Sequence, residues 1–411
     1  MKLTKRILSL ILCAVLALPV FVAAAPEAEA STNNNGWVIE RASRSERFAY
    51  YRGNAAKVTV PSGVTSVFYL SKSVREVHLS ASVTEFTIGY SGENLEKITV
   101  HRNNTRLFAR AGVLYSKSSS RGSTWTILEH YPAAKRDRTY SVLSGTWSIE
   151  TMMNDHLRTL HLPNSLQNII AQTFGGRRLK DITVGSRNRV FSVKNGVLYR
   201  EGRALLSNGQ DRTGSILVYY PGGRTNRTFT VPKGTLTIEN ITNSHLRTLR
   251  LPTSLLSIDY INARRLTGLH IPRNIHSPGR IKVGGGVTIA DRNRHLTMSG
   301  GVIFSKDMTE LIYYPPTKRN RTYTVPRGVK RLSGSAFMDN TRLRTLRLRP
   351  SVEYVGLRSP SIETLYLSSN VSIVSTNILN APRLRNIYVK RNSTSHQTIR
   401  DLELGLRIRF Y

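Results

Sequence analysis

The chain has 411 residues and carries 60 Lys and Arg against 25 Asp and Glu, a formal net charge of +35. So basic a surface favours polyanionic partners such as nucleic acid, anionic cell-wall polymers and sulfated or sialylated glycans. The single cysteine, Cys13, excludes intramolecular disulfides and a cysteine-ligated metal, so core burial alone has to stabilise the fold.

Arginine supplies most of the positive charge, because 45 of the 60 basic residues are Arg. The planar guanidinium fork suits phosphate, sulfate and carboxylate groups. The alternative is that codon usage explains the excess of Arg and that these side chains only solvate the surface.

Residues 1–30 have the pattern of a secretory signal peptide. Three basic residues precede an apolar run from Ile7 to Leu18, and Ala28-Glu29-Ala30 is a small-x-small cleavage site. The alternative, a retained membrane anchor, is disfavoured because the run is short for a membrane span and small residues follow it. Cleavage would remove three basic and two acidic residues, leaving a net charge of +34 and no transmembrane segment.

Residues 31–52, which include Trp37, Tyr50 and Tyr51, are expected to form a β-type N-terminal cap. From residue 53 to residue 401 the frame L-x-x-L-x-L recurs, with Ile or Val allowed at any apolar position. Its last two apolar residues alternate with a polar one, which is the period of a half-buried strand. The strand ends recur every 18 to 23 residues, the spacing of one strand plus one return per turn of a solenoid.

The repeats fall into four groups, called cassettes one to four. Their strand ends are at positions 60, 79 and 100; 142, 162 and 184; 231, 251, 271 and 289; and 325, 348, 367 and 389. The third cassette is expected to carry an extra turn around Arg280–Ile289. Stacked at roughly 4.8 Å, fourteen such strands predict a rod on the order of 60 Å long. Residues 402–411 alternate in polarity and are expected to form a strand that caps the open edge.

One pattern separates the cassettes and occurs three times. The motif Gly-Val-Leu/Ile-aromatic begins at residues 112, 196 and 301, and a twelve-residue stretch starting with Tyr-Pro follows at 131–142, 220–231 and 314–325. These motifs predict the two arms of a β-hairpin whose tip varies in length, at 116–123, 201–214 and 305–310. Because such self-similarity sets the architecture, we expect one repeat domain without a linker.

Taken together, these motifs resemble those of BspA-like leucine-rich repeat proteins, a family of bacterial secreted and cell-surface proteins. The family's approach to the hairpin stands here as Asn188–Tyr199, its Lys-Asp tip as Lys306-Asp307, its T-Y-T-V-P strand as Thr322–Pro326 and its S-A-F block as Ser335–Phe337. The resemblance implies a right-handed leucine-rich-repeat solenoid, mainly β, with short irregular or 3-10 returns and inserted β-hairpins. It also implies binding of host or matrix proteins and bacterial coaggregation.

Two departures from the family pattern bear on function. Arg187 and Arg292 replace acidic residues that the family usually has before the Asn of the approach. Asn154, Asn243 and Asn340 stand where the family usually has Cys. An Asn at that position is expected to hydrogen-bond buried backbone between turns rather than to hold a ligand.

The sequence shows no motif for catalysis. The metalloprotease, phosphate-loop, nucleophile-elbow and calcium-loop patterns are absent from it. Acidic residues are scattered and none recurs as a facing pair, so hydrolysis by two carboxylates is not expected. The ten His residues do not cluster at metal-ligand spacing. We therefore expect no catalytic site, no metal and no cofactor.

The candidate binding surface is the solvent face of the stacked strands. The residue before the last apolar position of each frame points outward, and stacking makes these residues a row. This first row contains His78, Thr99, His161, Thr183, Arg250, His270, Arg347, Tyr366 and Tyr388. A second row follows the first apolar position and contains Arg75, Glu96, Arg158, Lys180, Arg247, Thr267, Arg344, Glu363 and Arg385.

The two rows divide into self-neutralised and uncompensated parts. Arg75–Glu96 and Arg344–Glu363–Arg385 alternate in sign, which predicts ion-pair ladders of little energy. Arg158 and Lys180 do not alternate. Aromatic and Arg enrichment is typical of recognition surfaces, although an ordinary solvated strand face is the alternative. The candidate ligand-binding residues are Arg158, Lys180, Arg247, Arg250, His270, Arg344, Arg347, Tyr366 and Tyr388.

The sequence thus favours a secreted or non-covalently surface-associated recognition protein. The expected partner is an extracellular protein, a glycan or an anionic polymer, and any binding of nucleic acid would be non-specific. A second hypothesis is a structural envelope component held by charge to an anionic cell-wall polymer. A third is an extracellular enzyme scaffold, for which the residues give no support. Exposed positions vary freely on such folds, so the ligand itself is not specified.

Overall fold

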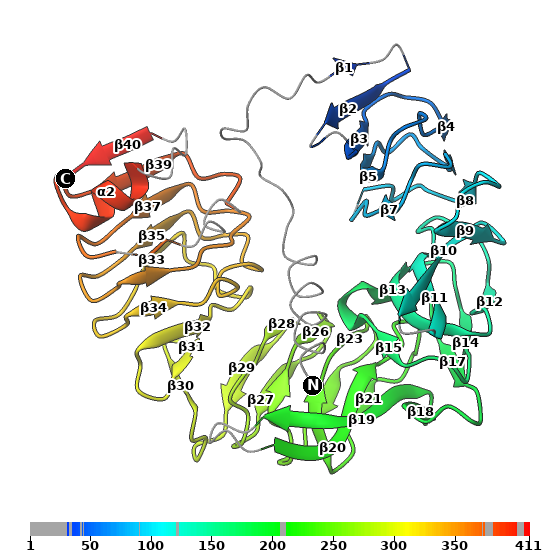
Figure 1. Ribbon diagram of the computed structural model, residues 1–411. Coiled ribbons are helices and arrows are strands. Elements are labelled where there is room, and N and C mark those ends of the chain that lie inside the picture. Colours follow the sequence, from blue (N-terminus) through cyan, green and yellow to red (C-terminus); the bar gives the residue numbers. More distant parts are fainter. Residues whose placement is uncertain are drawn as a thin grey trace.

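The computed structural model describes residues 31–32, 35–41, 43, 45–89, 91–120, 123–205, 211–371, 373–374, 381–400 and 407–411. The expected signal peptide lies outside the described residues, as do residues 206–210 of the second hairpin tip and residues 402–406. The chain forms a β-solenoid, as the repeat spacing predicts (Figure 1).

The strands that the L-x-x-L-x-L frame predicts form one set of parallel sheets, called the front sheets. They are β4 (Lys57–Thr59), β6 (Glu76–Leu79) and β8 (Lys97–Val100) in cassette one; β12 (Thr139–Ser141), β14 (Thr159–Leu162) and β17 (Asp181–Val184) in cassette two; β21 (Thr228–Thr230) with β24 (Thr248–Arg250), and β27 (Gly268–Ile271) with β29 (Gly286–Ile289), in cassette three; and β33 (Thr322–Thr324), β35 (Thr345–Arg347), β37 (Thr364–Tyr366), β39 (Asn386–Val389) and β40 (Arg407–Phe410) in cassette four. The extra turn expected in cassette three is confirmed, because β29 pairs in parallel with β27.

A second set, called the back sheets, lies on the other side of the core. Its strands are β1 (Ser31–Thr32), β2 (Trp37–Arg41), β3 (Arg47–Tyr51), β5 (Ser66–Leu70) and β7 (Glu85–Phe86); β9 (Leu107–Arg110), β10 (Val113–Ser120), β11 (Ser123–His130), β13 (Thr146–Met153) and β15 (Asn168–Ile169); β18 (Phe191–Lys194), β19 (Val197–Leu205), β20 (Asp211–Tyr219), β22 (Thr235–Ile238) and β25 (Ser257–Ile258); and β30 (Leu296–Ser299), β31 (Val302–Ser305), β32 (Glu310–Tyr313), β34 (Arg331–Leu332), β36 (Tyr354–Val355) and β38 (Ile373–Val374). Smaller ladders join β13 to β16 (Phe174–Gly175), and β23 (Ile241–Thr242) to β26 (Tyr260–Ala263) and β28 (Arg280–Val283).

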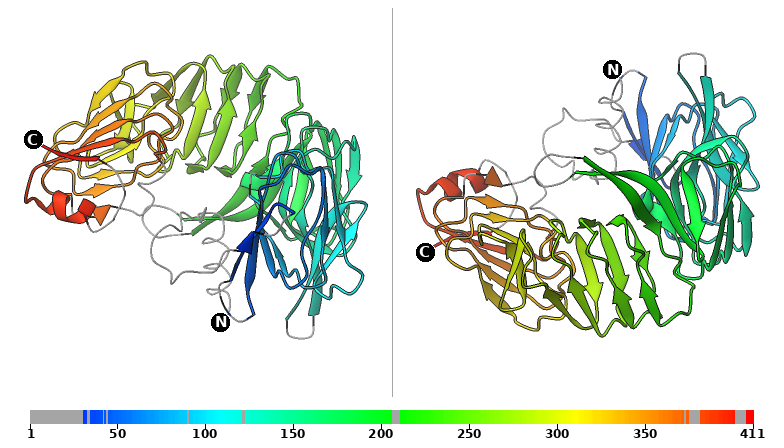
Figure 2. Two further views of the ribbon diagram at one scale, coloured as in Figure 1. Left: turned by 90° about the horizontal axis from the view of Figure 1, so that it is seen from above. Right: turned by 90° about the horizontal axis from the view of Figure 1, so that it is seen from below.

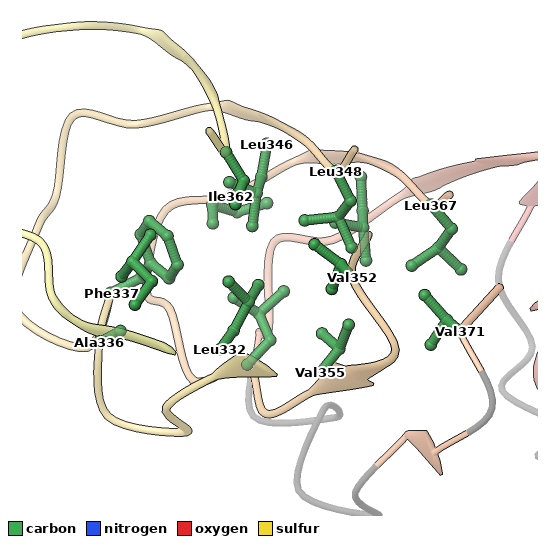
Figure 3. Close-up of a cluster of buried hydrophobic side chains, with 14 of the residues drawn as sticks. Leu332, Ala336, Phe337, Leu346, Leu348, Val352, Val355, Ile362, Leu367 and Val371 are labelled. Carbon is green, nitrogen blue, oxygen red and sulfur yellow. The ribbon is translucent and has the colours of Figure 1, made fainter. Parts of the chain in front are cut away.

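The core lies between the front and back sheets. In cassette four, Leu346 and Leu348 of the front face Leu332 and Val355 of the back (Figure 3). Strand alternation explains this arrangement, since every second side chain of a strand points to the same side. The two Leu positions singled out from the frame are buried, Leu249 at 6% exposure and Leu346 at 0%.

The predicted hairpins join successive cassettes. The first pairs β10 with β11, the second β19 with β20 and the third β31 with β32, all antiparallel. The first two hairpins are longer than expected, because their strands run to Ser120 and Leu205 through segments expected to be tips. Consecutive side chains of one arm enter the cores of two neighbouring cassettes: Leu114 packs with cassette one, whereas Val113 and Tyr115 pack with cassette two.

The solenoid is an open arc and not the straight rod that strand counting predicts (Figures 1 and 2). The front sheets are interrupted between cassettes, since no ladder joins β8 to β12 or β17 to β21 among the described strands. A hairpin enters the back sheet at each of these junctions, so the stacking direction changes there. The long β19–β20 hairpin projects into the concave side of the arc (Figure 2).

Buried Asn side chains connect the turns. The Asn154 amide nitrogen donates to the carbonyl oxygens of Pro132, Ala133 and Lys135, and its oxygen accepts from the Leu157 amide. Asn243 and Asn340 make equivalent bonds. The structural role predicted for these three residues is therefore confirmed. The same arrangement recurs at Asn104, Asn188 and Asn293, for which the sequence did not suggest it.

Two short helices complete the described fold. A 3-10 turn, η1, spans Ala171–Thr173. The helix α2 (Thr394–Arg400) was not predicted; the Ser393 hydroxyl accepts from the His396 amide at its start, and Ile399 is buried against the cassette-four core. Within the described part of the chain, no helix is long and apolar enough to cross a membrane.

Candidate functional site on the front sheets

The register of the front sheets places the expected outward side chains in rows. In cassette four, Arg347 pairs with Tyr366, Tyr366 with Tyr388, and Tyr388 with Arg409. Arg347 is exposed and both tyrosines are partly exposed. The register predicted from the frame is therefore right at these positions. Arg409 extends the row, and the sequence did not suggest it because the pairing partner of the last strand was unknown.

The side chains of this aromatic row, Arg347, Tyr366, Tyr388 and Arg409, stack on one another. The two tyrosine rings are parallel within 9°, with centroids 4.4 Å apart. The Arg347 guanidinium lies 3.8 Å from the centre of the Tyr366 ring, and that of Arg409 lies 5.9 Å from the centre of the Tyr388 ring. Aromatic pairs and cation–π contacts of this kind stabilise by about 1 kcal/mol each.

Three other positions of the first row form a repeated hydrogen bond. The Nδ1 atom of His78 lies 2.9 Å from the Thr99 hydroxyl, that of His161 lies 2.6 Å from Thr183, and that of His270 lies 3.1 Å from Thr288. Each pair joins two adjacent turns. His270, a predicted ligand-binding residue, is exposed but is thus also a cross-turn contact.

The second row contains an uncompensated run of cations in cassette two. The Arg158 amide donates to the Arg138 carbonyl and the Lys180 amide to the Arg158 carbonyl, each at 2.8 Å, so the three residues occupy successive turns. Arg158 and Lys180 are exposed, and none of the three makes a salt bridge to a described acidic residue. We call Arg138, Arg158 and Lys180 the cation row. Sequence inspection missed Arg138 because its strand lacks the full frame.

Cassette three continues this pattern with two cations. The Arg247 amide donates to the Arg227 carbonyl, and Arg250 stands outward at the end of β24. Arg247 and Arg250 are exposed and have no salt bridge with the described acidic residues.

Cassette one is the contrasting case. There Arg75 pairs with Glu96 at 2.8 Å, Lys57 with Glu76 at 3.2 Å, and Lys72 with Glu93 at 3.1 Å. The predicted Arg75–Glu96 ladder is therefore present, and the front of this cassette is locally neutralised.

Arg344 differs from the other candidates. It pairs with Glu363 at 3.2 Å and donates to the Thr341 carbonyl oxygen at 2.9 Å. The Arg344–Glu363 part of the predicted ion-pair ladder is therefore present. These contacts engage the Arg344 side chain within the protein. Arg344 is therefore not among the residues proposed to contact the ligand.

The expectation that acidic residues do not recur as a facing pair is wrong, because two such pairs lie on the back sheets. On the back sheets Glu129 interacts with Glu150 of the next turn, and Glu239 interacts with Asp259. Desolvation raises the pKa of Glu129, Glu150 and Glu239. Partial desolvation and the Glu239 charge raise the pKa of Asp259 to about 6.

Three of these carboxylates accept a hydrogen bond from a side chain of the fold. Ser116 donates to Glu129, Ser148 to Glu150 and Arg200 to Glu239. Each pair lies one repeat apart, on or directly after adjacent parallel back strands, and the pairs were missed because the back strands lie outside the L-x-x-L-x-L frame. In the described part of the chain, His, Asp and Glu form no group of three or more suited to a metal ion.

Comparison with known proteins supports the repeat assignment. Residues 316–400 match the model of the BspA type leucine rich repeat region, in 6 copies, which confirms the resemblance inferred from the motifs. No curated protein matches the chain.

Several solved structures align over most of the chain at low identity. A leucine rich cell surface protein from Faecalibacterium prausnitzii is 14% identical, with 95% of this chain and 96% of that chain covered and a TM-score of 0.32. The pneumococcal vaccine antigen PcpA is 15% identical, with 88% and 82% covered and a TM-score of 0.26. A leucine-rich repeat protein from Eubacterium ventriosum is 13% identical, with 87% and 95% covered and a TM-score of 0.30.

Proposed function

We propose that this chain, which carries BspA-type leucine-rich repeats, is an exported or cell-surface protein that binds a linear polyanion along its front sheets. The export pattern of residues 1–30 supports the extracellular part of the proposal. The family resemblance supports a role in adhesion or recognition.

One observation carries the polyanion proposal, namely the uncompensated cations on adjacent turns. Unit charges one strand spacing apart repel by roughly 0.8 kcal/mol in water. Cassette one relieves such repulsion with glutamates, whereas the cation row and Arg247 have no such partner among the described residues. A polymer with regularly spaced anions would neutralise several turns at once and release their counterions.

A four-residue variant of the front sheets tests the proposal. Changing Arg158, Lys180, Arg247 and Arg250 to Gln removes four charges from exposed positions. We expect binding of a labelled heparin fragment at low salt to fall by at least roughly tenfold. The slope of log Kd against log salt should flatten by roughly 0.7–0.9 per lost contact, by analogy with nucleic acid.

The matched control removes the same formal charge from turns outside the front sheets. Arg187, Arg189, Arg292 and Arg294 are exposed, and no side-chain contact ties them to the described residues. Changing these four to Gln should alter heparin affinity far less. Equal loss in both variants would show that the charge acts diffusely. Failure of the unmodified protein to bind any polyanion at low salt would instead favour a protein ligand.

The hairpin-turn residues Arg224, Arg227, Arg319 and Arg321 are a less suitable control set. The carbonyls of Arg227 and Arg321 accept from Arg247 and Arg344 of the second row, so both residues adjoin the proposed site. Arg224 interacts with Tyr220.

The structural-envelope hypothesis makes a separate prediction from the same surface. If the protein is held on anionic wall polymer by charge, washing intact walls with high salt should release it. The Gln variant of the front sheets should then be released at lower salt than the control variant. Retention of both at high salt would oppose this role.

A further inference from the structure

The aromatic row differs in kind from the cation row, although both lie on the front sheets. Each tyrosine ring is covered on both faces: Tyr366 lies between Arg347 and Tyr388, and Tyr388 lies between Tyr366 and Arg409. Sugar rings stack on the open faces of aromatic side chains, and this row offers no open face. It exposes ring edges, hydroxyl groups and guanidinium groups instead.

The exposed groups of the row are hydrogen-bond donors. Neither the Tyr366 nor the Tyr388 hydroxyl has a hydrogen-bond partner among the described residues, and neither is a buried atom. By contrast, the Tyr115 and Tyr140 hydroxyls bond to each other inside the core at 2.6 Å. The order along the row is thus charged, neutral, neutral, charged.

A second line of neutral polar groups runs beside the aromatic row. Thr345, Thr364 and Asn386 occupy paired positions on β35, β37 and β39, two residues before the members of the aromatic row. All three are partly exposed on the same side of the sheet. Arg407 of β40 pairs with Asn386 and ends this line. The Arg347 guanidinium at one end, and those of Arg407 and Arg409 at the other, therefore flank a strip of hydroxyl and amide groups.

We propose, on the basis of the polyanion-binding function above, that the aromatic row binds an acidic polysaccharide. Its two Arg residues receive two anionic groups of the chain, about 14 Å apart over three strand spacings. The two tyrosine hydroxyls donate to the neutral hydroxyl or ether oxygens between them. An inorganic polyphosphate carries a charge at every unit and has no neutral segment to match the tyrosines. The order of charged and neutral groups along the aromatic row therefore favours a polysaccharide.

The first test removes only the two phenol hydroxyl groups. The double variant Tyr366→Phe with Tyr388→Phe keeps the ring stack and the cation–π contacts. Two hydrogen bonds at about 0.5–1.5 kcal/mol each predict a loss of heparin-fragment affinity of roughly fivefold or more. Polyphosphate affinity should change less than roughly twofold. Equal losses on the two polymers would overturn the choice of a polysaccharide.

The second test removes the two charges that flank the tyrosines. Arg347→Gln with Arg409→Gln should weaken heparin and polyphosphate binding together. Neutral dextran should bind no variant measurably, and dextran binding as tight as heparin binding would overturn the assignment. Heparin affinity unchanged in the Tyr-to-Phe variant would show that the hydroxyls face solvent only, which also overturns it.

The back sheet of the same cassette offers a control with one residue of each kind. Arg331 lies 5.1 Å from the centre of the Tyr354 ring there, a similar cation–π pair on the opposite side of the core. Tyr354→Phe with Arg331→Gln should leave heparin affinity within roughly twofold. If the four-charge variant of cassettes two and three loses binding while the aromatic-row variants do not, the proposed function holds and this inference fails. If the unmodified protein binds neither polymer, the proposed function itself fails.

Discussion

Single polar side chains connect the turns of this solenoid without any cysteine. An amide such as Asn243 satisfies three backbone carbonyls of the preceding turn with its nitrogen and two backbone amides with its oxygen. Leaving a buried carbonyl unpaired costs about 1–3 kcal/mol, so each of these Asn residues stabilises the junction between two turns. The amide is also neutral, and its bonds do not depend on pH.

The buried His130 is the opposite case, because its contribution depends on pH. The ring packs edge-on against Phe86 with centroids 5.6 Å apart, and Nε2 has no hydrogen-bond partner among the described residues. Burial lowers the pKa of His130 to about 4. An unfolded chain would protonate this residue near pH 6.5.

We therefore expect His130 to destabilise the protein in acid. Above about pH 6.5 the His130 ring is neutral in both the folded and the unfolded state. Below that pH the unfolded state binds the proton first. The free energy of unfolding therefore decreases as the pH falls towards 4, by up to about 3 kcal/mol. His130→Phe should remove this dependence. Urea titrations at several pH values measure it, and the difference between the two proteins isolates His130 from the carboxylates, which are common to both. Parallel pH profiles would contradict the expectation.

At the scale of elements, the hairpins decide how the cassettes join. The alternating side chains of one arm pack into two neighbouring cores, so an arm cannot move without disturbing both. The second hairpin has an additional contact: Ala204 of β19 is buried against Leu236 and Leu256 of cassette three. Arg200, at the base of the same arm, pairs with Glu239.

The long hairpin is consequently less tolerant of shortening than its variable sequence suggests. Deleting residues 202–213 removes Ala204 and uncovers Leu236 and Leu256, which should cost about 1–3 kcal/mol. Deleting only residues 206–210 and closing the strands with a two-residue turn should cost less, because Ala204 stays. Thermal melts of both variants compare the two deletions. Equal stability would mean that the small cluster contributes nothing.

At the scale of the whole molecule, stability is distributed along the arc. The buried side chains form a series of cassette cores joined at the hairpins, and each turn contacts mainly its neighbours. The front sheets present different charge patterns along this series: paired in cassette one, cationic in cassettes two and three, and aromatic with Arg in cassette four. A long polymer can therefore meet several kinds of contact on one molecule.

This organisation predicts that core damage spreads locally. Leu346 is fully buried in cassette four, so Leu346→Ala should cost about 2–5 kcal/mol. Hydrogen exchange should show lost amide protection in β33, β35 and β37, with β4, β6 and β8 unchanged. A uniform loss over all cassettes would show that the arc unfolds as one unit.

The repeat, the strand register and the outward rows follow from local sequence pattern. The reason is local: a side chain's side of the sheet follows from strand alternation, and turn spacing follows from repeat length. Tyr366 and Tyr388 were placed in one row on that ground alone. Only the tertiary structure shows the features that strand alternation does not specify, namely the arc and the contacts between particular strands. The arc depends on how hairpins break the front sheets, and the Glu129–Glu150 and Glu239–Asp259 pairs depend on which back strands meet. Arg409 joined the aromatic row only because β40 pairs with β39, and Arg138 joined the cation row only because its backbone lies against Arg158.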